Sequence, residues 1–146
     1  MTEVHEGGCA CGAVRYRTAG APKRVSLCSC SWCRTRTGSA FGISVYFAEP
    51  EVTFVQGALQ PWRRIADSGR WLEAEFCPTC GTTVTWTLEA FPDFRGLAGG
   101  TFDPPTFWYR PERWVYADSR PEWLQIPPGL EVCPEMAPVG FSAEEH

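Results

Sequence analysis

The spacing of the cysteines constrains this chain more than any other feature of its sequence. Three cysteines, Cys28, Cys30 and Cys33, fall within six residues. Residues this close together cannot easily reach the Cα separation and the dihedral angle that a disulfide requires. Their thiolates are suited instead to hold a metal ion, for which they would supply three of four tetrahedral ligands.

Two further pairs of cysteines lie far apart in the chain, as Cys9-Ala10-Cys11 and Cys77-Pro78-Thr79-Cys80. A glycine follows each pair and lets the backbone turn tightly, so that adjacent N–H groups point toward thiolate sulfur. We expect the two pairs to close one structural zinc site with four thiolate ligands. Its loss would unfold the domain, because the free energy of metal binding is folding free energy in such a site.

The cysteine triplet allows two interpretations. In the first, it is a second structural zinc site that a distant residue completes, namely His5, Cys133 or a carboxylate. In the second, the fourth position is open to water or substrate. Zinc on three thiolates is a weak Lewis acid that suits soft ligands, and it would hold an incoming thiol as a thiolate. That thiolate could attack a small electrophile such as an aldehyde, and the reverse reaction would cleave a carbon–sulfur bond.

The composition is that of a globular domain. Of 146 residues, 44% are hydrophobic and 21% are charged, which argues against a disordered or a membrane protein. No apolar run approaches the roughly 18 residues that cross a bilayer, and the first residues lack the regions of a signal peptide. We therefore expect a cytoplasmic protein with reduced thiols. The net charge of −4 and the dispersed arginines argue against nucleic acid as a partner.

Short alternating segments punctuated by Gly and Pro predict a mainly β fold of antiparallel sheets with short helical turns. Residues 62–66 and 71–76 should form a hairpin around Asp67-Ser68-Gly69. Residues 31–37 should form a short helix that Ser31 caps and Gly38 ends. Further strands are expected at 4–8, 13–18, 23–27, 40–47, 51–55, 82–88, 94–102 and 114–116, and a helical turn at 121–124.

We expect a single zinc-binding domain over residues 1–125. Residues 126–146, rich in Pro, Gly and Glu, should form a tail that packs on the domain or frays from it. This tail carries Cys133, the odd thiol of the chain. A homo-oligomer through an exposed sheet face is compatible with such an architecture.

Five segments together form a specific motif. They are Gly8-Cys9-x-Cys11-Gly12-x-Val14-Arg15-Tyr16, residues 28–41 with Cys28-x-Cys30-Ser31-x-Cys33-Arg34, Phe76-Cys77-Pro78-x-Cys80-Gly81-Thr82, residues 100–103 and residues 113–124. Over roughly residues 7–124, the sequence resembles the family of the glutathione-dependent formaldehyde-activating enzyme (GFA) and centromere protein V.

The resemblance implies a zinc-stapled β-tent and a carbon–sulfur lyase that adds glutathione to formaldehyde, giving S-hydroxymethylglutathione. By the same resemblance, Cys28, Cys30 and Cys33 match the catalytic zinc ligands, and Ser29 stands where the family often has His. The structural zinc ligands of the family match Cys9, Cys11, Cys77 and Cys80. The centromere relatives suggest, by analogy of fold alone, a non-catalytic zinc-binding module for a thiol or a protein partner.

Other residues near the triplet are candidates for a thiol-substrate pocket. Trp32 could form a wall of this pocket or serve as packing. Arg34 and Arg36 could bind the carboxylates of a glutathione-like thiol or be ordinary surface residues. Ser39 could offer a backbone N–H near the open zinc or belong to a turn into the next strand.

Overall fold

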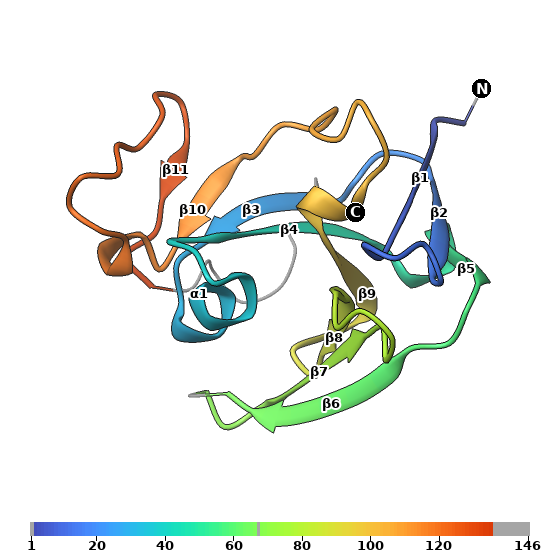
Figure 1. Ribbon diagram of the computed structural model, residues 1–146. Helices are drawn as coiled ribbons and strands as arrows, with labels where there is room; N and C mark the ends of the chain where they lie inside the picture. The colour runs from blue at the N-terminus through green and yellow to red at the C-terminus, as the bar shows by residue number, and fades with distance from the viewer. Residues whose placement is uncertain (1, 67, 136–146) are drawn as a thin grey trace.

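The computed structural model describes residues 2–66 and 68–135, which form two β-sheets and one α-helix (Figure 1). The mainly β class predicted from the sequence is confirmed. The smaller sheet has the strand order β1-β2-β5. Its strands are β1 (Val4–Gly8), β2 (Arg15–Ala19) and β5 (Val52–Gln56).

The larger sheet has eight strands in the order β11-β10-β3-β4-β9-β8-β7-β6. It curls, so that the single helix α1 (Ser31–Thr37) lies between β3–β4 and the β6–β7 hairpin (Figure 1). The strands are β3 (Arg24–Cys28), β4 (Gly42–Ala48), β6 (Gln60–Ile65), β7 (Trp71–Phe76), β8 (Thr83–Leu88), β9 (Phe91–Ala98), β10 (Arg113–Val115) and β11 (Glu131–Val132).

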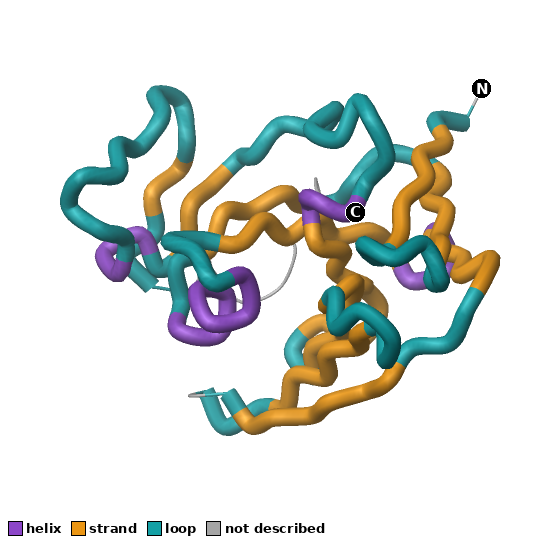
Figure 2. The backbone as a smooth tube through the Cα atoms, in the orientation of Figure 1, coloured by secondary structure: helices purple, strands orange, loops and turns teal. Residues whose placement is uncertain are grey.

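Local sequence patterns account for most of these elements. In β2, alternation buries Tyr16 and Thr18 and leaves the residue between them exposed, as a half-buried strand requires. The predicted hairpin forms, with Ile65 opposite Trp71, while Asp67 lies outside the described residues. Loops connect the strands, and those before and after β10 are long; single-turn 3₁₀ helices lie at Glu49–Glu51, Gly99–Thr101 and Ala117–Ser119 (Figure 2).

Two strand pairs are parallel, whereas only antiparallel pairs were expected. β10 runs parallel to both β3 and β11. Residues 99–112 carry the chain from β9 past β4 and β3, so that β10 enters at the far side of β3 and in the same direction. Of the predicted tail, residues 126–135 are described: β11 extends the sheet, and Ile126 and Leu130 pack near Trp114.

The ends of the helical segments differ slightly from the sequence predictions. Helix α1 has the predicted bounds and ends at Gly38, whose φ of 63° is left-handed. Its N-cap, however, is Cys30 rather than Ser31, because the Cys30 sulfur accepts a hydrogen bond from the Cys33 N–H. Residues 121–124 form a turn, and the nearby helical element is the 3₁₀ turn Ala117–Ser119.

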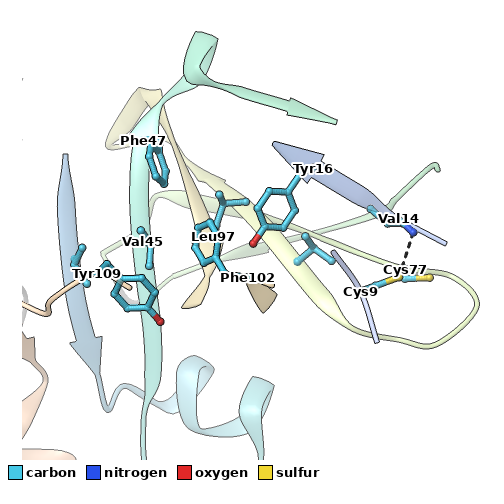
Figure 3. Packing of buried hydrophobic residues seen from close by; sticks show 11 residues of the cluster. Cys9, Val14, Tyr16, Val45, Phe47, Cys77, Leu97, Phe102 and Tyr109 are labelled. Atoms are coloured by element: carbon cyan, nitrogen blue, oxygen red, sulfur yellow. Dashed lines mark hydrogen bonds between the residues drawn. The ribbon is translucent and has the colours of Figure 1, made fainter. Parts of the chain in front are cut away.

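The principal core lies between the two sheets (Figure 3). Tyr16, Val45, Phe47 and Leu97 are all fully buried there. Cys9 and Cys77 lie at one end of this cluster, beside Val14 (Figure 3). A cysteine group therefore closes one end of the core.

In the part of the chain that the structure describes, no helix is both long and apolar enough to span a bilayer.

A smaller cluster around Trp86 supports helix α1. Trp86 is fully buried and lies opposite Gly96, and a Cβ added at Gly96 would overlap the indole ring. We predict that Gly96→Ala lowers the free energy of unfolding by about 1–3 kcal/mol, because overpacking displaces the ring. Urea unfolding followed by tryptophan fluorescence measures this loss. Gly100→Ala is the control, since nothing lies within 4 Å of its added Cβ, and an equal loss in both variants would contradict the packing argument.

Candidate metal centres and the adjoining pocket

The first cysteine group brings together two segments that are distant in sequence. The sulfur atoms of Cys9, Cys11, Cys77 and Cys80 all lie within 4.8 Å of one another. The Sγ atoms of Cys9 and Cys11 are 3.6 Å apart, and those of Cys11 and Cys77 are 3.8 Å apart. Four sulfurs around a zinc ion, with bonds of about 2.3 Å, lie about 3.8 Å apart. The donor set and its spacing therefore fit a tetrahedral metal site.

Tight turns shape both halves of this group. The Val14 N–H donates to Cys9 Sγ at 3.2 Å, as the dashed line in Figure 3 shows. Gly12 and Gly81 both have a φ of 80°, which a residue with a side chain rarely adopts. The Thr82 hydroxyl lies 3.2 Å from Cys80 Sγ, and its hydrogen bond, with backbone N–H groups, lowers the pKa of Cys80 to about 5. The second turn thus favours the thiolate of Cys80, the form that binds metal.

The triplet lies where β3 passes into α1. Cys28 ends β3, Cys30 caps the helix and Cys33 lies in its first turn. Their three sulfurs also lie within 4.8 Å of one another. Cys30 accepts hydrogen bonds from the other two thiols, which lowers its pKa to about 2, whereas Cys28 acts as a donor within the triplet, which raises its pKa far above its usual range. The triplet therefore stabilises a thiolate, and its donor set fits a soft divalent ion such as zinc.

None of the described residues joins the triplet as a fourth ligand. Cys133 packs in the same apolar cluster as Cys28 and Cys33, but its sulfur is not among those within 4.8 Å of one another. Its thiol instead donates to a Glu131 carboxylate oxygen at 3.8 Å. His5 stacks on Trp108, with ring centroids 3.5 Å apart. The predicted fourth-ligand candidates His5 and Cys133 are thus engaged elsewhere.

A pocket of about 380 Å³ adjoins the triplet. Its walls come from β3, β4, the start of α1, the β6–β7 hairpin, the turn between β8 and β9, and residues 115–119. Aromatic side chains form much of the lining, and four arginines contribute to it. The aromatic residues are Trp32, Tyr46, Trp71, Phe91 and Tyr116, and the arginines are Arg24, Arg34, Arg64 and Arg70.

A profile of the family described as glutathione-dependent formaldehyde-activating enzyme matches residues 4–119. The chain belongs to this GFA family. The matched range includes both cysteine groups and confirms the resemblance noted in the sequence. The name of the family refers to glutathione and formaldehyde, so the activity of the family is of the glutathione-dependent, formaldehyde-activating type.

Among solved structures, the chain is similar to the crystal structure of a Rhodobacter sphaeroides protein. The TM-score is 0.54 and the sequence identity 22%, over 75% of this chain and 99% of that one. At this identity the likeness shows the fold alone. No curated protein matches the chain at a significant level.

Of the residues that the sequence suggested for a substrate pocket in this GFA-family chain, the structure places only some beside the triplet. Trp32 and Arg34 line the same pocket as the triplet. Ser39 does not: it lines a second pocket of about 480 Å³, together with Gly81 and Thr82 of the four-cysteine group. Helix α1 separates these positions, because Trp32 lies near its start and Ser39 follows its end.

Sequence reasoning missed the residues that line the 380 Å³ pocket from strands other than β3, the strand that leads into the triplet. Arg64 and Arg70 come from the β6–β7 hairpin, and among the described residues neither is paired with a carboxylate. Tyr46 comes from β4, and burial raises the pKa of its hydroxyl, which accepts a hydrogen bond from Trp86 Nε1 at 3.1 Å. The adjacent pair Arg63-Arg64 was visible in the sequence, but nothing in it placed the hairpin opposite the triplet.

Proposed function

We propose that this chain is a zinc-dependent carbon–sulfur lyase of the GFA type. It would add a low-molecular-weight thiol such as glutathione to a small aldehyde such as formaldehyde, or catalyse the reverse cleavage. The observation that carries the proposal is the gathering of three thiols on the wall of a pocket, with no fourth protein ligand among the described residues. In the addition, a bond forms between sulfur and the carbonyl carbon, and the thiol proton ends on the carbonyl oxygen.

Cys28, Cys30 and Cys33 would hold the zinc ion. When bound, zinc supplies the acidity, because it lowers the pKa of a thiol that ligates it. The pocket lies on the open side of the triplet, so a thiol that enters it can approach the three sulfurs. Trp32, from the same turn, forms part of the apolar wall that would exclude water from the reacting carbon.

The arginines of the pocket would orient the thiol. A glutathione-like molecule carries carboxylates, which guanidinium groups bind through paired, charge-assisted hydrogen bonds. Arg34 is fixed near the triplet, because its Nε donates to the Ser29 carbonyl oxygen at 3.0 Å. Arg64 and Arg70 approach from the hairpin. These three residues would hold the carboxylates away from the metal and leave the sulfur directed toward it.

Hydroxyl groups, rather than imidazole or carboxylate groups, are available to the aldehyde oxygen. The lining residues that the structure describes include no histidine, aspartate or glutamate. Tyr46, Tyr116 and Ser31 are among them. A hydroxyl that donates a hydrogen bond to the carbonyl oxygen would favour the charge that develops there as the carbon–sulfur bond forms.

The proposal predicts a specific effect of the hairpin arginines. In the double variant R64A/R70A, we expect the KM for glutathione to rise about tenfold or more, since each lost charged hydrogen bond is worth about 1.5–3 kcal/mol. The KM for 2-mercaptoethanol, which has no carboxylate, should change little. Exchange spectroscopy by NMR on the zinc-loaded protein measures the exchange rate with formaldehyde at a series of concentrations of each thiol. The two KM values follow from these rates.

Two outcomes of this assay would count against parts of the proposal. A wild-type protein that holds zinc at the triplet and does not accelerate exchange above the solution rate would refute the lyase activity. If such a protein still bound glutathione, it would be the alternative, a non-catalytic zinc module for a thiol. Equal effects of R64A/R70A on both thiols would refute the carboxylate-binding role of the arginines.

A further inference from the structure

Arg36 lies against the triplet on the side of α1 that faces away from Arg34. Its Nη2 donates to Cys33 Sγ at 3.9 Å. Residues two positions apart on a helix are separated by about 200° around its axis. Arg34 accordingly lines the 380 Å³ pocket, whereas Arg36 lines the second pocket beside Gly42. The two arginines therefore have different surroundings and cannot have the same role.

Two tryptophans hold the guanidinium group of Arg36 in place. Its Cζ atom is 4.5 Å from the ring centroid of Trp86 and 5.0 Å from that of Trp32. The two indoles meet edge to face, with centroids 5.2 Å apart. Cation–π contacts of this kind are worth more when the cation is removed from water. The position of Arg36 is thus fixed by residues of the core and of the triplet itself.

The chain leaves space for this guanidinium group. A Cβ added at Gly42 would overlap Arg36 Nη2 and would come within 3.3 Å of Cys33 Cβ. The Nε of Arg36 is buried and has no hydrogen-bond partner among the described residues. Leaving a charged donor unsatisfied in this way costs free energy. No carboxylate among the described residues pairs with Arg36, so the sulfur of Cys33 is the acceptor that this cation faces.

Charge gives the reason for such an arrangement. Three thiolates and one divalent ion together carry a net charge near −1, and a fourth thiolate would make it near −2. We propose that Arg36 is a positioning residue that compensates the negative charge of the metal-loaded triplet and so raises its affinity for the metal and for an incoming thiolate. The inference rests on the metal site of the proposed function but does not depend on carbon–sulfur chemistry.

Metal affinity tests this inference directly. In Arg36→Met, we expect the triplet to bind Co²⁺ or Zn²⁺ about 10- to 100-fold more weakly, the usual effect of losing a partner of a metal ligand. Affinity is measured by competition with a chromophoric chelator, and thiolate ligation is followed by the charge-transfer absorption of Co²⁺. The four-cysteine group is the internal reference and should keep its metal in every variant.

Four further variants separate charge from packing. Arg36→Lys keeps the charge and should recover part of the affinity, whereas Arg110→Met, which removes the same charge from an exposed position, should bind like wild type. Gly42→Ala keeps the arginine but displaces it and should also weaken binding. Gly100→Ala is its control, because its added Cβ would meet nothing within 4 Å.

An affinity of Arg36→Met within twofold of wild type would overturn the inference, as would equal losses in Arg36→Met and Arg110→Met. A folded wild-type protein that takes up no metal at the triplet would overturn it as well. By contrast, a protein whose second metal depends on Arg36 but which does not accelerate the carbon–sulfur exchange would support the inference and refute only the proposed function.

Discussion

Replacing Cys77 by serine should abolish the folded state. Cys77 is fully buried at the end of the principal core, and its sulfur lies among the four thiols of the first group. Structural zinc sites contribute about 10–16 kcal/mol of apparent binding free energy in small zinc-binding peptides. A domain of this size is stable by only about 5–15 kcal/mol. Loss of the metal therefore removes a contribution as large as the whole stability, and the serine hydroxyl is left buried in place of a ligand.

Circular dichroism and the dispersion of amide NMR signals would show this loss, in protein produced and purified with excess zinc. Cys133→Ser is the matched control, since Cys133 is also buried but lies outside both groups of clustered thiols. It should retain the fold and lose about 1–3 kcal/mol for a buried hydroxyl. A Cys77→Ser protein with a native spectrum and a loss of that same small size would show that the four-cysteine group does not hold the fold together.

Local sequence patterns predicted both cysteine groups and every strand except β11, which lies in the predicted tail, for physical reasons. Alternation of apolar and polar residues reports which face of a strand is buried, and Tyr16 and Thr18 follow it. The two cysteine groups were predictable because closely spaced thiols are suited to ligate one metal ion, and a single ion can join two such pairs that are distant in the sequence. The sulfurs of Cys9 and Cys77, 68 positions apart, lie within 4.8 Å of each other, as a shared metal ion would require.

Features that depend on non-local packing were not predictable in this way. The parallel register of Trp114 with Leu27 follows from the path of a long connection, not from the composition of either strand. The curl of the larger sheet places Arg64 opposite the triplet. The residue pattern of β6 predicts only an exposed edge strand and does not indicate what that strand faces. The identity of the N-cap was missed because serine is the commoner capping residue, whereas here the geometry of the triplet directs the Cys30 sulfur to the helix N-terminus.

Replacing Cys30 by serine should leave the fold intact and remove the second metal together with the activity. Cys30 is half-buried at the pocket and contributes to neither sheet. A serine hydroxyl is a good N-cap and can accept the Cys33 N–H in place of sulfur, so α1 should persist. The triplet would keep two thiolates, too few to hold zinc firmly. We expect the zinc content to fall from two ions per chain to one, and the rate of glutathione–formaldehyde exchange to fall to that in solution.

Cys30→Ala separates the two roles of this residue. It should lose the same metal and the same activity, and about 1 kcal/mol more of stability than Cys30→Ser, because alanine cannot cap α1. The contrast with Cys77→Ser decides what the triplet is for. If Cys30→Ser unfolds the chain as Cys77→Ser should, the triplet is a second structural site. If it stays folded, keeps both ions and keeps its rate, the triplet is not the reacting centre. Loss of one ion and of the rate, in a folded chain, assigns the chemistry to the three thiols at the pocket.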